Sequence, residues 1–124
     1  MSYLVDFDDL PPIDVWGERV RARALDGENC TIALVELAPD APVPEHRHAN
    51  EQMGTVLHGS ITFTIDDETR TLTRGGTWRI PSDHPHHATA GPDGALVIDI
   101  FAPARHDWDD LPHLAPRPVP WPGR

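Results

Sequence analysis

Residues 61 to 65 read Ile-Thr-Phe-Thr-Ile, a strict alternation of apolar and polar side chains. Because successive side chains along a β-strand point to opposite faces, this stretch predicts a half-buried antiparallel strand with its apolar face toward a core. An amphipathic helix would instead need apolar residues three and four positions apart. The stretch therefore indicates a β-rich domain.

Short runs of β-branched or apolar residues lie on both sides of this stretch and are separated by turn-forming residues. The runs cover residues 20–25, 30–37, 52–57, 69–73, 77–80, 86–90 and 95–101. The Asp26-Gly27 step predicts a hairpin, and residues 58–60 and 91–94 predict turns. Turn signals at intervals of about eight to twelve residues, without a helix-period stripe, are typical of a β-sandwich or barrel. We expect an all-β domain of about eight to ten short strands.

The two ends of the chain differ in composition from this central part. Residues 1–18 contain two adjacent prolines and no sustained periodicity, so we expect an N-terminal arm that can add one edge strand. Residues 19–103 would form the barrel, and residues 104–124 a Pro-rich C-terminal tail. Because proline lacks a backbone donor, this tail cannot join a central strand. It is either an extended arm packed by Trp108 and Trp121 or a disordered segment.

The overall composition limits the classes of function. The 124 residues suit one domain, and the net charge of −10 argues against nucleic acid or an anionic membrane as a partner. All basic residues are arginines, which excludes lysine Schiff-base chemistry. Cys30 is the only cysteine, so an intrachain disulfide is excluded, and we expect a buried thiol. Without a basic leader or a membrane-length apolar run, we expect a cytoplasmic protein.

Four candidate metal ligands stand out: His46, His48, Gln52 and His86. Histidines one residue apart on an extended backbone point to the same side, so His46 and His48 can share one ion. The same parity favours Gln52 over its neighbour Glu51, and His86 would come from a distant strand. This set predicts one divalent transition metal ion, either Zn, Ni, Fe or Mn. Because every ligand is neutral, the ion would keep its full charge, which favours Lewis-acid chemistry on a small anionic substrate.

The spacing of these residues resembles the two sequence motifs of the cupin family. The first motif is glycine, five residues, His-x-His, three or four residues, glutamate, six residues and glycine. It corresponds here to Asp40, His46, His48, Gln52 and Gly59. The second is glycine, five residues, Pro-x-Gly, two residues, histidine, three residues and asparagine. It corresponds to Gly75, Pro81, Asp83, His86 and Ala90. The resemblance implies a double-stranded β-helix, a jelly-roll-like barrel with the metal near its mouth.

The chain departs from these motifs at four positions. Asp40 and Asp83 replace glycines, and aspartate tolerates the left-handed backbone conformation better than most residues. Ala90 replaces asparagine. Gln52 replaces the ligand glutamate, which shifts our expectation from redox chemistry toward Lewis-acid isomerisation.

The last apolar run contains an aspartate that needs an explanation. Asp99 shares a strand face with Phe101, and Arg105 follows after a proline. A carboxylate in so apolar a run requires a partner or a polar cavity. A structural ion pair between Asp99 and Arg105 is one interpretation. In the other, Asp99 transfers protons and Arg105 holds a substrate carboxylate.

This segment is similar to one cupin subgroup, the pectin-degradation cupins that convert 4,5-unsaturated uronates to linear keto acids. The similarity rests on Asp99, Phe101, Pro103 and Arg105 together with the His-x-His segment. It implies Asp99, Phe101 and Arg105 as catalytic or substrate-contacting residues. It also implies a metal-dependent, ring-opening and tautomerising isomerase that acts on a small anionic sugar acid.

Two other functions stay open from the sequence. One is a cupin oxygenase or cyclase that acts on an aromatic, polyketide-like or diketone substrate. The other is a cupin that binds a ligand without catalysis. The resemblance also implies that a homodimer can form. The remaining histidines receive no ligand role: His84 falls in a loop, His87 has the opposite parity to His86, and His58, His106 and His113 follow no pattern.

Overall fold

The structure is a computed structural model that describes residues 2–123. Within this range the helical residues form two short 3-10 turns, η1 (Phe7–Asp9) and η2 (His106–Asp110), and neither is long enough to span a membrane. The strands are β1 (Ile13–Asp14), β2 (Val20–Asp26), β3 (Thr31–Leu37), β4 (Pro42–His46), β5 (Glu51–Ile65), β6 (Glu68–Leu72), β7 (Thr77–Ile80) and β8 (His86–Ala102). The predicted all-β fold is confirmed.

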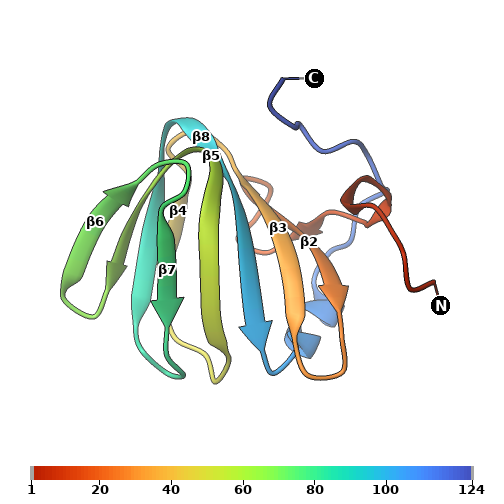
Figure 1. Ribbon diagram of the computed structural model, residues 1–124, viewed down its shortest axis with the longest axis horizontal. Helices are drawn as coiled ribbons and strands as arrows, with labels where there is room; N and C mark the ends of the chain where they lie inside the picture. The colour runs from red at the N-terminus through yellow and green to blue at the C-terminus, as the bar shows by residue number, and fades with distance from the viewer. Residues whose placement is uncertain (1, 124) are drawn as a thin grey trace.

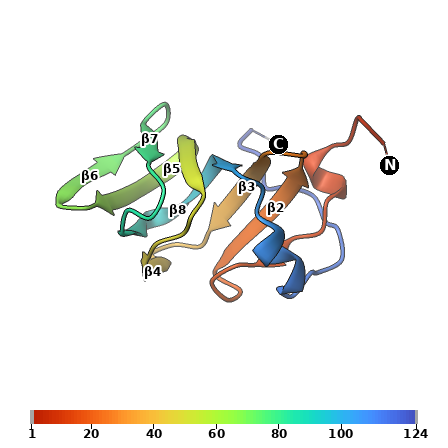
Figure 2. The ribbon, with the colours of Figure 1, turned by 90° about the horizontal axis from the view of Figure 1, so that it is seen from below.

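Two long strands, β5 and β8, each pass through both layers of the structure. In the first layer the order is β1-β2-β3-β8-β5-β7, with residues 95–102 of β8 and 51–56 of β5. In the second layer the strand order is β4-β8-β5-β6, to which β8 contributes residues 86–90 and β5 contributes residues 61–65. Figures 1 and 2 show the curved antiparallel sheet, with β6 at one end and β2 at the other. Within residues 2–123, β1 and β6 do not pair, so the jelly-roll-like barrel is open.

The turns predicted at residues 58–60 and 91–94 are bends inside these long strands, so the prediction that strands end there was wrong. Pairing shifts between Gly59–Ala95 and Ile61–Ala90, which leaves residues 91–94 as a bulge. Gly59 has a φ of 79°, and a Cβ there would lie 2.1 Å from the carbonyl oxygen of Gly94. Glycine at position 59 therefore allows the two strands to bend together from one layer into the other.

Three local predictions can be compared with the backbone. Asp40 and Asp83 both have a positive φ, 59° and 60°, so aspartate supplies the left-handed turn at these motif positions. The hairpin is confirmed, because β2 and β3 pair as far as Asp26 and Thr31. Cys30, by contrast, is exposed, so the prediction of a buried thiol was wrong. It lies in the turn between the two strands, before the buried face of β3 begins.

The main hydrophobic core lies between the two layers, and a smaller cluster lies outside the β3–β8 face. Trp108, from η2, belongs to the main core. Val119 joins Leu34 and Leu96 in the outer cluster, and Trp121 packs against it. Both terminal segments lie on the β2–β3 side of the sheet (Figures 1 and 2). Trp108, Val119 and Trp121 thus anchor the Pro-rich tail on the sheet at separate points.

Candidate metal centre

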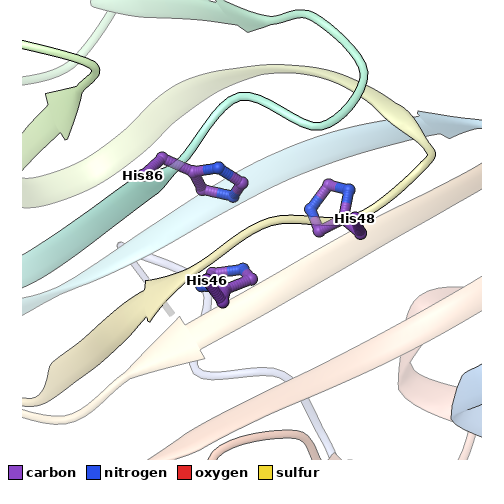
Figure 3. Close-up of side chains that lie close together, drawn as sticks. All are labelled: His46, His48 and His86. Atoms are coloured by element: carbon purple, nitrogen blue, oxygen red, sulfur yellow. The ribbon is translucent and has the colours of Figure 1, made fainter.

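Three histidines meet at the end of the sheet where β4 approaches β8. His46 ends β4 and is the cross-strand partner of His86, which begins β8. His48 follows in the loop that leads to β5. One ring nitrogen from each lies within 4.8 Å of the others, and Figure 3 shows the three rings turned toward one another. The two motifs therefore deliver their histidines to one place, although 37 residues lie between the second and the third.

The tautomer of each imidazole is fixed by a backbone carbonyl. Nδ1 of His46 lies 2.8 Å from the oxygen of Pro44, and Nδ1 of His48 lies 2.9 Å from that of Asn50. Nδ1 of His86 lies 2.8 Å from the oxygen of His84. A carbonyl only accepts hydrogen bonds, so each Nδ1 carries the proton and each Nε2 presents a lone pair. Nδ1–H bonds of this kind orient metal-ligating histidines.

The Nε2 atom of His86 is buried and has no hydrogen-bond partner among residues 2–123. The residue itself is only 2% exposed. A buried acceptor without a partner is unfavourable, because it has lost water and gained nothing in return. A cation at the centre of the three rings would satisfy it. This orphaned atom shows that the residues present fit a bound metal ion.

Burial lowers the pKa of all three histidines. For His86 burial is the largest cause, and it brings the pKa to about 4. Burial is also the main cause for His46 and His48, and the Arg105 guanidinium adds to it. Rings with a lowered pKa are neutral at pH 7, which is the protonation state that coordinates a metal.

Gln52 lies beside this group, as the strand parity predicts. Its side chain is buried, whereas Glu51 is exposed. Its Oε1 atom lies 3.2 Å from Nε2 of His48. Two acceptor atoms at this distance repel each other unless a cation lies between them. Gln52 thus offers an oxygen as a fourth ligand.

Asp99 is buried next to Gln52, at 7% exposure. Its Oδ1 atom accepts hydrogen bonds from Nε2 of Gln52 at 2.9 Å and from the indole Nε1 of Trp78 at 2.8 Å. Burial raises the pKa of Asp99 to about 6, although both hydrogen bonds and the Arg105 charge act in the opposite direction. A carboxyl group with such a pKa can exchange protons near neutral pH.

Arg105 does not form the ion pair with Asp99 that one interpretation predicted. Its Nε and Nη2 atoms donate to Asp107, both at 3.0 Å. Its guanidinium also lies over two aromatic rings, 4.7 Å from the centre of Phe101 and 4.5 Å from that of Trp108. The Phe101 ring in turn contacts His48 at 5.8 Å between ring centroids. The guanidinium is therefore held beside the histidines by stacking and by Asp107.

One cavity of about 230 Å³ joins these groups. Its polar lining residues are His46, Gln52, His86, Asp99, Arg105 and Asp107. The rest of its wall is mostly apolar and belongs to the main core, with Phe63 and Phe101 among its aromatic residues. A mostly apolar pocket with a few converging polar groups is typical of a small-molecule site.

Sequence reasoning missed three residues of this site. Trp16 lines the cavity and lies 4.9 Å from His46 between ring centroids, but the arm that carries it shows no periodicity. Asp107 lies in a segment that the sequence assigns to the tail. Trp78 was assigned to a strand without a role. A hydrogen bond from Trp78 to a buried acceptor such as Asp99 could have been suspected, because the N–H group of a buried indole needs an acceptor.

The two histidines nearest His86 in the sequence lie outside the group. His84 contacts Oδ2 of Asp66 at 2.8 Å, and His87 lies 3.8 Å from Oε1 of Glu45. Their partners are carboxylates rather than other imidazoles. Neither belongs to the three-histidine group, although the backbone oxygen of His84 accepts from Nδ1 of His86.

Comparison with known proteins adds a family and several relatives. The family model described as "Cupin domain" matches residues 33–101. Dimethylsulfoniopropionate lyase DddW from Ruegeria pomeroyi is 27% identical over 89 residues, which is 72% of this chain. The chain spans only 59% of that relative's length.

Solved structures support the same fold. KdgF from a Halomonas species has a TM-score of 0.76 and 25% identity, covering 86% of this chain and 97% of that one. An RmlC-like cupin from Shewanella frigidimarina has a TM-score of 0.79 and 23% identity, covering 86% and 96% respectively. Both neighbours are therefore matched over almost their whole length.

Proposed function

Because this chain belongs to the cupin family, whose model matches more than half of its length, we propose that it is a metal-dependent enzyme that opens and tautomerises a small anionic sugar acid. The proposed substrates are unsaturated uronates. The likeness to the pectin-degradation cupins in sequence and the structural match to KdgF both favour this choice over other cupin reactions.

The observation that carries the proposal is that one cavity is lined by two of the three grouped histidines, His46 and His86, together with a buried carboxyl group and an arginine. A proton-transfer group, a cation site and an anion-binding side chain are what this isomerisation requires. When bound, a divalent ion would supply positive charge for the substrate carboxylate and for the oxygen that becomes an enolate. His46, His48, His86 and Gln52 would hold it.

Asp99 is the proposed proton-transfer group. Its Oδ1 atom takes both hydrogen bonds, and the structure shows none to Oδ2 within residues 2–123. As a carboxylate, Asp99 would remove the proton of the hemiacetal hydroxyl; the C–O bond of the ring would break, and an aldehyde and an enolate would form. The same proton would then go to the carbon next to the enolate carbon, which yields the ketone. The reaction is an isomerisation, so no other reactant is needed.

Arg105 is the proposed carboxylate clamp. Nε and Nη2 are used by Asp107, but no hydrogen bond from Nη1 is found within the described residues. The planar guanidinium is held on its aromatic neighbours and loses little freedom when an anion binds. The positive charge also opposes the repulsion that a net charge of −10 exerts on an anionic substrate. Phe101, between Arg105 and His48, would exclude water.

The test is to remove metal from the purified protein, reload it with Zn, Ni, Fe or Mn, and add unsaturated mono-uronates. With at least one of these metals, we expect the enol absorbance to fall faster than it does in the spontaneous reaction. A rate equal to the spontaneous one with all four would contradict the proposal. His84→Gln is the matched control for His86→Gln, since only the second removes a ring from the group.

A second candidate is elimination from a small carboxylate, which the match to DddW favours. Asp99 would again be the base, here removing a proton next to the carboxylate. Dimethylsulfoniopropionate in the same assay would distinguish the two, because elimination releases dimethyl sulfide. Oxygen consumption with a diketone or phenolic substrate would instead support the oxygenase that the sequence left open.

A further inference from the structure

The carboxylate of Asp99 links the candidate metal centre to a residue outside it. Nε2 of Gln52 and Nε1 of Trp78 both donate to the same oxygen, Oδ1, at 2.9 and 2.8 Å. All three side chains are buried, with 5–7% exposure. Gln52 and Asp99 line the cavity, but the low exposure keeps bulk water from the hydrogen bonds at Oδ1, which makes these bonds strong and their loss unfavourable.

This network decides which way the amide of Gln52 faces. An amide has one donor end and one acceptor end, and Asp99 as a carboxylate can only accept. The NH₂ group must therefore turn to Asp99, and Oε1 must turn to the opposite side. There it lies 3.2 Å from Nε2 of His48, the lone-pair side of that ring. Asp99 thus directs an oxygen, rather than an NH₂ group, at the ion site.

Trp78 reaches Asp99 only because residue 54 is glycine. Gly54 on β5 is the register partner of Trp78 on β7 and of Asp99 on β8. A Cβ at position 54 would lie 2.4 Å from the indole Nε1 and 2.5 Å from the carbonyl oxygen of Ile98. The indole therefore crosses over Gly54 to donate to the carboxylate on the far strand. No side chain can replace this glycine without displacing Trp78 or the β8 backbone.

We propose that Trp78, placed over Gly54, is a positioning residue that acts through Asp99 to hold Gln52 with its oxygen directed at the metal. The pairing of Gln52 with Asp99 also explains why this chain has glutamine where the cupin motif has glutamate. A glutamate at position 52 would set one carboxylate against another inside a buried network. The inference rests on the metal centre of the proposed function and goes beyond it by coupling residues 52, 78 and 99.

The first experiment measures metal affinity, without substrate, in the full-length protein. Trp78→Phe keeps a ring but removes the indole donor, and Trp121→Phe on the outer cluster is its matched control. Affinity for Zn²⁺ and Ni²⁺ is read by competition with a chromophoric chelator, and circular dichroism checks the fold. We expect Trp78→Phe to weaken binding about tenfold, as for other residues that support metal ligands, and Trp121→Phe to leave it unchanged. Equal affinity in both folded variants would overturn the positioning role.

The second experiment tests the coupling and does not depend on the Trp78 variant folding. Gln52→Glu is compared with the double variant Gln52→Glu/Asp99→Asn, in which the amide of residue 99 can donate to the new carboxylate. We expect the double variant to bind Zn²⁺ at least about tenfold more tightly than Gln52→Glu alone. Equal or weaker binding in the double variant would overturn the inference. Since no substrate is involved, inactivity toward uronates would count only against the proposed function.

Discussion

His46 and His86 are direct partners across β4 and β8, and the centres of their imidazole rings lie 4.3 Å apart. Sheet register, rather than a loop, thus brings the two motifs together. Because Nε2 of His86 is buried and has no partner in the part of the chain that the structure describes, removal of this ring should affect metal binding strongly and folding little. We predict that His86→Gln lowers affinity for Zn²⁺ by more than about 100-fold.

The control for this change is His84→Gln. His84 bonds to Asp66 and is not one of the three grouped histidines, so the affinity of this variant should stay within about threefold of the wild type. Both affinities are measured by isothermal titration of the metal-free protein. If the two variants lose affinity equally, the three-histidine site is wrong.

Asp99→Asn should separate metal binding from catalysis. The amide can still accept the bonds from Gln52 and Trp78 through its oxygen, so the metal site should stay largely intact. It cannot take up the hydroxyl proton. We predict that kcat on the uronate falls by about 10²–10⁴-fold with bound metal unchanged, measured by enol absorbance and elemental analysis. Wild-type kcat in this variant would remove Asp99 from the mechanism.

Arg105→Gln should raise KM more than it lowers kcat. The substitution removes the charge and the guanidinium that lies over Phe101 and Trp108. Arg105→Lys keeps the charge but not the planar fork, so we expect an intermediate effect. We predict a KM increase of about tenfold or more for Arg105→Gln. An unchanged KM in steady-state assays would mean that another group holds the carboxylate.

The metal-free protein should show two opposing effects of pH on its stability. The pKa of His86 is lowered to about 4 in the folded state, so the unfolded chain binds more protons below pH 6.5 and acid destabilises the fold. The pKa of Asp99 is raised to about 6, so the folded state binds more protons above pH 3.8 and acid stabilises it. Each effect amounts to about 3 kcal/mol across its range and is complete near pH 4.

Removing Asp99 should therefore expose the effect of the histidines. We predict that metal-free Asp99→Asn loses about 3 kcal/mol more unfolding free energy than the wild type between pH 7 and pH 4. Urea unfolding at several pH values measures this difference. Parallel pH profiles for the two proteins would show that Asp99 does not titrate in the folded state within this range.

Gly54→Ala should destabilise the fold through overpacking. The new Cβ would meet a backbone oxygen at 2.5 Å and the Trp78 indole at 2.4 Å. We predict a loss of about 2 kcal/mol or more in the free energy of unfolding. Gly27→Ala is the matched control, because its nearest atom would lie at 3.4 Å in the β2–β3 turn, and it should be close to neutral. A neutral Gly54→Ala would contradict the tight crossing of Trp78 over β5.

Patterns that repeat along the strand predicted most of this fold. The alternation over residues 61–65 can be recognised from neighbouring residues alone. The three histidines His46, His48 and His86 can be recognised because their spacing matches the cupin motifs. The sequence predicts turns where β5 and β8 bend, because glycine is common both in turns and in bends within strands. Whether the chain ends its pairing there depends on the partner strand, which a local pattern does not contain.

The site was less predictable than the fold for a similar reason. Strand parity selected Gln52, but the donor from Trp78 depends on a register between β5, β7 and β8 that no short segment encodes. The partner of Arg105 proved to be Asp107, two residues away, in a Pro-rich tail for which the sequence left both a packed arm and a disordered segment open. The register between distant strands and the packing of the tail are tertiary properties. Neither can be predicted from the spacing of residues along the sequence.

β8 carries His86 at its start and Asp99 and Phe101 near its end, with the bulge at residues 91–94 between them. The proposed metal ligand His86 and the proposed substrate-facing residues Asp99 and Phe101 thus occupy separate halves of one strand. A change in the length of the bulge would shift one half relative to the other without altering any side chain of either. Because Gln52 pairs with Phe101 and donates to Asp99, the same shift would carry the proposed fourth ligand away from or toward His86, so the length of the bulge sets the distance between the two parts of the ligand set.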